Sequence, residues 1–139
     1  MASGWYEEGL HGLMNKEIDL DTDTIKVRIV ADEDYSAPAD FGTDTTMSTI
    51  TKYSGSTDYT LTSVDITTTK GTIDAADASP AFSTVVQDAA KDVDGLVVFH
   101  FVTDDAGSTP LFYIDLTTPV TPNGGDINIT WNGSGLASL

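Results

Sequence analysis

The residues with the clearest spacing for chemistry are three aspartates near the start of the chain. Asp19, Asp21 and Asp23 alternate with other residues, as the first ligands of an EF-hand calcium loop do. The later positions do not fit, because the sixth is Thr24 where glycine is needed and the twelfth is Val30 where a bidentate glutamate is needed. We therefore expect a solvated acidic turn with no metal ligands.

Other acids also gather between the expected strands, at residues 32–34, 74–77 and 104–105. Oxygen ligands of this kind suit calcium, so weak binding at a subunit boundary stays open for these loops. Pairs of carboxylates also occur in glycosidases, but the chain has 22 acids and such pairs arise by chance. The sequence therefore assigns no metal site and no pair of catalytic carboxylates.

The two histidines do not form a catalytic or zinc-binding pattern. His100 lies inside the apolar run 98–102, and a general base there would need an orienting carboxylate and a reachable substrate. We expect an ordinary strand residue whose ring nitrogens find local partners, and we expect His11 to be a surface residue. The chain has no cysteine, no G-x-S-x-G elbow, no P-loop, no dinucleotide fingerprint and no H-E-x-x-H. We therefore expect no enzymatic activity and no cofactor.

The net charge of −16 narrows the classes of partner. It arises from 22 acids and only 6 bases, which argues against phosphate contacts and against adsorption to anionic membranes. The longest apolar run, residues 96–99, is too short to span a bilayer. Glu7 and Glu8 stand where a signal peptide has basic residues, so we expect synthesis in a cytoplasm. Neither nucleic acid nor membrane is an expected partner.

Alternating side chains predict the first long strand. Ile25, Val27 and Ile29 share one face, while Lys26 and Arg28 share the other. Because charged side chains avoid the core, this strand is expected to have one buried and one solvated face.

The later part of the chain is also typical of strands separated by turns. Residues 96–102 are nearly all apolar and predict a central strand covered on both faces, and residues 104–110 predict the loop of an antiparallel hairpin. In the last strand, residues 127–131, Trp131 shares the period of the two isoleucines and is expected in the core. Residues 32–56 predict a long surface loop with room for one short edge strand, and residues 74–94 are ambiguous between helix and extension.

Only residues 1–16 have a helical pattern. Ser3 is a candidate N-cap, and Gly9 and Gly12 weaken an isolated helix by about 1 kcal/mol each, so packing must hold it. Its apolar residues approximate one stripe, and those near the terminus are the least constrained by the core. We expect them to contact another subunit; they are Trp5, Tyr6, Leu10, Leu13 and Met14.

These elements predict a single all-β domain over residues 1–139. We expect an antiparallel β-sandwich or flattened barrel of about six to eight strands, with a short N-terminal helix. A domain of this size folds without disulfides or metal.

Three segments carry a resemblance to a known group of proteins. Residues 17–30 read EIDLDTDTIKVRIV, residues 110–116 read PLFYIDL, and the chain ends INITWNGSGLASL over residues 127–139. In this order they resemble the opening, a late strand and the terminus of small structural proteins of tailed phages, which look like capsid decoration (cement) proteins. The chain departs from that pattern at residues 53–61, where a glycine-rich centre is reduced, and at Arg28, where a small residue is common.

The resemblance implies a non-enzymatic virion protein that binds the outer capsid surface and stabilises the head. The implied partners are the major capsid protein and sister copies, with a dimer or trimer as the expected homo-oligomer. The implied location is the capsid surface of the virion. A tail or fibre module that binds a host glycan is the alternative, and a small calcium-dependent hydrolase is a third, distant one.

Overall fold

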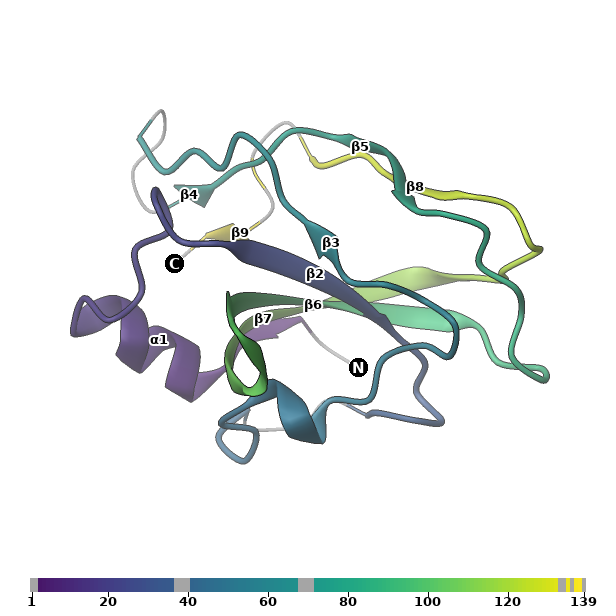
Figure 1. Ribbon diagram of the computed structural model, residues 1–139, viewed down its shortest axis with the longest axis horizontal. Coiled ribbons are helices and arrows are strands. Elements are labelled where there is room, and N and C mark those ends of the chain that lie inside the picture. The colour runs from purple at the N-terminus through teal and green to yellow at the C-terminus, as the bar shows by residue number, and fades with distance from the viewer. Residues whose placement is uncertain (1–2, 37–40, 68–71, 133–134, 136, 139) are drawn as a thin grey trace.

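The computed structural model describes residues 3–36, 41–67, 72–132, 135 and 137–138. Strands dominate this part of the chain, and the single α-helix in it lies near the N-terminus (Figure 1). In chain order the elements are β1 (Gly4–Trp5), α1 (Glu7–Met14), β2 (Ile25–Val30), the 3-10 helix η1 (Met47–Thr49), β3 (Tyr59–Thr60), β4 (Thr72–Ile73), β5 (Ala78–Phe82), β6 (Val93–Val102), β7 (Asp104–Val120), β8 (Ile127–Ile129) and β9 (Ala137–Ser138).

The described strands form one main sheet and two small ones, all antiparallel. The main sheet has the order β1-β7-β6-β2-β3, and the small sheets are β4-β9 and β5-β8. Figure 1 shows β5 and β8 on one side of the main sheet and η1 on the other. The prediction of an all-β sandwich with a short N-terminal helix is confirmed, and β6 is the expected central strand.

The pleat of the main sheet divides its side chains between two faces. The first, which we name the strand-covered face, packs against β5 and β8 and carries Ile25, Val27, Ile29, Leu96, Val98, Phe112, Ile114 and Leu116. The second, which we name the loop-covered face, packs against the described parts of residues 31–58, including Tyr35, Phe41, Met47 and Ile50, and carries Lys26, Arg28, Val30, Val97, Phe99 and Tyr113. Both faces are therefore covered.

This arrangement corrects two expectations. Arg28 is only 3% exposed, so β2 has two buried faces where one was predicted. Residues 32–56 are more than a surface loop, because Tyr35, Met47 and Ile50 are buried beneath the sheet as its second core. The described part of that segment contains η1 and no strand.

The N-terminal segment also differs from the prediction. Residues 4–5 form a strand, and the helix spans only Glu7–Met14 with Tyr6 at its N-cap position. Ser3 does not cap it, because its hydroxyl accepts a hydrogen bond from the backbone N–H of Asp115 at 2.9 Å. Residues 4–5 form a strand because the edge of β7 offers them main-chain hydrogen-bond partners. A further helical turn would lose these partners.

Two further segments have a secondary structure that their sequence pattern did not predict. The β6–β7 hairpin is confirmed, but its turn is tight: Val102 pairs with Asp104, Thr103 has φ 57°, and all of the expected loop, residues 104–110, lies in β7. Residues 74–94 contain β5 and no helix. Among the described residues, no helix is long and apolar enough to cross a membrane.

Candidate functional site

The five predicted contact residues do not form one surface stripe. Trp5 is half-buried on β1, where its ring meets the edge of Phe112 with 5.0 Å between ring centroids. Leu10 and Leu13 are half-buried on α1, and Met14 is 83% exposed. Tyr6 has no exposed surface, so its assignment to a contact surface is wrong for this fold.

Tyr6 is buried because it starts a hydrogen-bonded chain beneath the loop-covered face. The Tyr35 hydroxyl donates to Asp44 at 2.8 Å, so the Tyr6 hydroxyl is the donor in its 2.7 Å bond to Tyr35. Burial raises the pKa of both phenols above the usual value of tyrosine. These two hydroxyls therefore tie Tyr35 and Asp44 to the N-terminal segment and are not poised for proton transfer near neutral pH.

Tyr113 is a third buried phenol on the same face. Its hydroxyl lies over Gly95 and has no hydrogen-bond partner among the described residues. Burial, with a contribution from Asp32, raises its pKa to about 12. This hydroxyl therefore adds a desolvation cost without a hydrogen bond to offset it.

The acidic turn of residues 19–23 uses its carboxylates locally. Asp19 Oδ1 accepts from the N–H of Asp21 at 3.0 Å, and Asp23 Oδ2 accepts from the N–H of Asp19 at 2.8 Å. Asp23 also lies 3.2 Å from His100 Nε2, which gives that histidine a local partner. His11 is exposed on α1. Over the described ranges, no group of three acids, histidines or cysteines could hold a metal ion.

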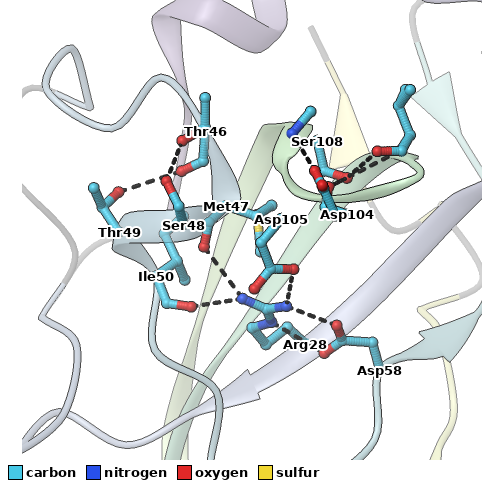
Figure 2. Close-up of polar contacts among 12 residues, drawn as sticks. Arg28, Thr46, Met47, Ser48, Thr49, Ile50, Asp58, Asp104, Asp105 and Ser108 are labelled. Atoms are coloured by element: carbon cyan, nitrogen blue, oxygen red, sulfur yellow. Dashed lines mark hydrogen bonds and ion pairs between the residues drawn. The ribbon is translucent and has the colours of Figure 1, made fainter.

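The strongest polar cluster is centred on Arg28, and it was not predicted as a site (Figure 2). Its guanidinium donates two bonds to Asp58 at 2.8 and 3.0 Å, and one to Asp105 at 2.8 Å. It also donates to the carbonyls of Ile50 at 2.6 Å and Met47 at 3.3 Å. Burial alone would lower the pKa of Arg28, but the bonds to Asp58 and Asp105 outweigh it and raise the pKa.

This cluster is structural, because all its donors already bind the chain's own groups. It ties η1, the approach to β3 and the β6–β7 turn to one point on β2. The sequence did contain a signal, an arginine where the resembling proteins have a small residue. Its partners are 19 to 77 positions away, so spacing along the chain could not reveal them.

The described residues also line an apolar cleft on the strand-covered face. Its volume is about 310 Å³, and it opens between the edge of the main sheet and the β8 segment. Ile114, Leu116 and Val120 of β7 line one side, and Ile127 and Trp131 line the other. Trp131 packs against the core as predicted, with its ring N–H donating to the carbonyl of Ala76 at 3.2 Å.

A second cleft of about 330 Å³ lies beside the C-terminal end of α1 and is lined by Leu13, Lys16 and Ile66 among others. Its wall is less apolar than that of the first cleft, because Lys16 and Asp19 also line it. Leu13 is the one predicted contact residue on this cleft.

No known family model matches this chain, and no curated protein matches it either. The geometry above and the resemblance of the three segments are therefore the grounds for a functional proposal.

Proposed function

We propose that this protein is a non-enzymatic phage virion protein that binds the outer surface of the head as a decoration or cement protein. One observation carries the proposal: two of the segments with that resemblance supply strands to one sheet, because β2 of residues 17–30 and β7, which contains residues 110–116, both pair with β6. Gly4 and Trp5, which precede the first segment, pair with Tyr113 and Phe112 inside the second, and the N–H of Tyr6 donates to Leu111 at 2.9 Å (Figure 1). The N-terminal residues 4–5 and these two resembling segments thus belong to the same sheet.

The charge balance supports binding to a cationic or polar shell surface rather than to nucleic acid. Of the six bases, Arg28 is enclosed and Lys91 binds Asp34 and Asp88, at 2.7 and 3.3 Å. Because acids far outnumber bases, the molecule has a strongly negative electrostatic field, which steers it toward cationic partners.

Stabilisation of a shell requires only that the protein bind the assembled state more tightly than free subunits. The proposed partners are the major capsid protein and sister copies, and dimers or trimers suit symmetric positions on a shell. The structure leaves Trp5, Leu10, Leu13 and Met14 as the surface-accessible members of the predicted contact set.

Sedimentation with heads that lack the protein tests this function. Removal of residues 1–16 is unsuitable, because Tyr6 belongs to the core. Met14→Glu changes an 83% exposed side chain and keeps the fold, and Val86→Glu, at a 68% exposed site, is its matched control. We expect the wild-type protein to co-sediment in many copies per particle, Met14→Glu to bind about tenfold more weakly, and Val86→Glu to bind normally.

Absence of the wild-type protein from heads would contradict the proposed function. A glycan-array signal together with that absence would favour the fibre module instead. Among the described residues the exposed large apolar side chains are Met14, Val86, Val102 and Val120, and none is an aromatic platform for a sugar.

A further inference from the structure

We propose that the apolar cleft between β7 and the β8 segment binds a bulky apolar side chain of another protein, flanked in that protein by lysine or arginine. The inference rests on the proposed function only for the identity of the partner, which would then be the capsid subunit. The cleft itself is argued from its size, walls and charge.

The size of the cleft favours side chains over a larger ligand. A closed apolar cavity of about 150 Å³ is enough for a benzene ring. At about 310 Å³ this cleft has room for roughly two such groups, and it lies at the lower end of the range for small-molecule sites. Val120 is 38% exposed and Thr130 is exposed, so the cleft is open to an entering chain.

Among the described residues, the walls are apolar and their side chains are incompletely covered. Ile114 and Leu116 of β7 face Ile127 and Trp131 across the cleft, and all four side chains are half-buried. An apolar group placed between them removes the remaining surface from water, at roughly 25 cal/mol for each Å² buried. The exposed Asn128 at the rim offers polar atoms to the main chain of an entering segment.

The surroundings of the cleft are acidic. Asp77 accepts from the N–H of Trp131 at 2.7 Å, Asp92 accepts from the Thr121 hydroxyl at 2.7 Å, and Asp126 precedes Ile127. No lysine or arginine lines the cleft in the described part of the chain. Such a rim attracts a cationic flank and disfavours, at this cleft, the acidic surface of a second copy of this chain.

A fluorescence titration tests the proposal directly. The chain has two tryptophans, so a Trp5→Phe background leaves Trp131 as the only one, and Trp131 lines the cleft. The probes are three capped peptides: Lys-Leu-Phe-Lys, Glu-Leu-Phe-Glu and Lys-Ser-Ser-Lys. We expect a saturable change with Lys-Leu-Phe-Lys alone, weakened by added salt.

A pair of matched variants separates the cleft from the rest of the surface. Val120→Lys puts a cation into the cleft and should weaken binding of Lys-Leu-Phe-Lys about tenfold or more. Val102→Lys makes the same change at a 42% exposed valine that does not line the cleft, and should leave binding unchanged. Equal effects of the two variants, equal binding of all three peptides, or no saturation by about 1 mM would overturn the inference.

Head sedimentation with the same variants distinguishes this inference from the proposed function. Loss of head binding in Val120→Lys but not in Val102→Lys supports both. Peptide binding without any head binding leaves the cleft standing and removes the proposed function. Head binding that Val120→Lys does not weaken, with no peptide response, removes the cleft and leaves the proposed function. A wild-type dimer that Val120→Lys dissociates would assign the cleft to a second copy and overturn the inference.

Discussion

The strand-covered and loop-covered faces of the main sheet are closed by different kinds of contact. On the strand-covered face, β5 and β8 contribute apolar side chains such as Phe82 and Ile129, and the β7 side stays open as the cleft. On the loop-covered face, residues 31–58 have no strand among those described, and Arg28 and Tyr35 hold them by hydrogen bonds. Apolar packing tolerates an opening, whereas a segment without its own sheet needs directed bonds to hold one position.

Substitution of Arg28 should cause the largest loss of unfolding free energy, because its hydrogen bonds hold the loop-covered face together. Arg28→Met leaves Asp58 and two carbonyls without their donor, so we expect a loss of about 3–5 kcal/mol in unfolding free energy. Lys26→Met, on the same strand and face, removes only a cation–π contact with Phe101 and should cost about 1 kcal/mol or less. Urea unfolding of both variants measures the difference. Equal losses would mean that the polar anchor does not hold the loop-covered face.

Alkaline pH should destabilise the protein through its loop-covered face. Tyr6, Tyr35 and Tyr113 all lie on that face, and burial raises the pKa of each above 10.0. The fold keeps its full stability below pH 10 and loses stability as pH rises, for Tyr113 through about 12, because the unfolded chain releases the phenolic proton more readily. Phenolate absorbance and circular dichroism followed together should change in one step above pH 10. Full ionisation of every tyrosine with the fold intact would contradict the burial of these phenols.

Substitution of the two glycines in α1, Gly9 and Gly12, tests how closely this helix packs against β7. A Cβ on Gly9 would lie 2.5 Å from the Pro110 carbonyl oxygen and 2.7 Å from Leu111 Cα, which are main-chain atoms. Gly9→Ala should therefore cost about 1–3 kcal/mol despite a helix-propensity gain of about 1 kcal/mol.

Gly12→Ala is the matched control in the same helix. Its Cβ would meet Ile18 Cδ1 at 2.5 Å, the free end of a side chain, so the propensity gain and the shift of Ile18 should nearly cancel. Thermal unfolding compares the two variants. A Gly9→Ala protein as stable as Gly12→Ala would show that α1 is not pressed against β7.

The smallest expected changes in unfolding free energy come from removing the hydroxyl of Tyr113 or of Tyr6, and the two changes differ in sign. Tyr113→Phe removes a buried hydroxyl without a partner among the described residues and should leave unfolding free energy unchanged or raise it by up to about 1 kcal/mol. Tyr6→Phe removes the donor to Tyr35 and should lower it by about 1 kcal/mol. Denaturant midpoints of the two variants give the signs. A destabilised Tyr113→Phe protein would indicate a bound water or other partner for that hydroxyl.

The sequence predicted the elements whose pattern is local. Alternation located β2, and an apolar run located β6 with both faces buried. Prediction from the sequence failed where contacts between residues far apart in the chain determine whether a side chain is buried. Nothing near Arg28 in the chain indicates that Asp58 and Asp105 lie beside it, so a buried arginine looked like a solvated one. Tyr6 looked free because its partner Tyr35 lies 29 residues away.

The candidate site was predicted less well than the fold. Trp5 and Met14 keep some exposed surface, but the apolar cleft was not foreseen. Its two sides come from residues 114–120 and 127–131, which look like ordinary core strands in the sequence. Only the way β8 sits over the sheet leaves them half-covered, and periodicity contains no information about how completely two layers meet.

The pairing of β1 with β7 sets an order for folding during synthesis. Ser3 and Asp115 are bonded across 112 positions, so the first element of the chain has its partners almost at the other end. At roughly 5–20 residues per second, the ribosome delivers β7 several seconds after β1 emerges. Until then Trp5 and Tyr6 lack the β7 backbone to which they bond in the folded protein. The docking of β1 therefore waits for the synthesis of β7, more than a hundred positions later.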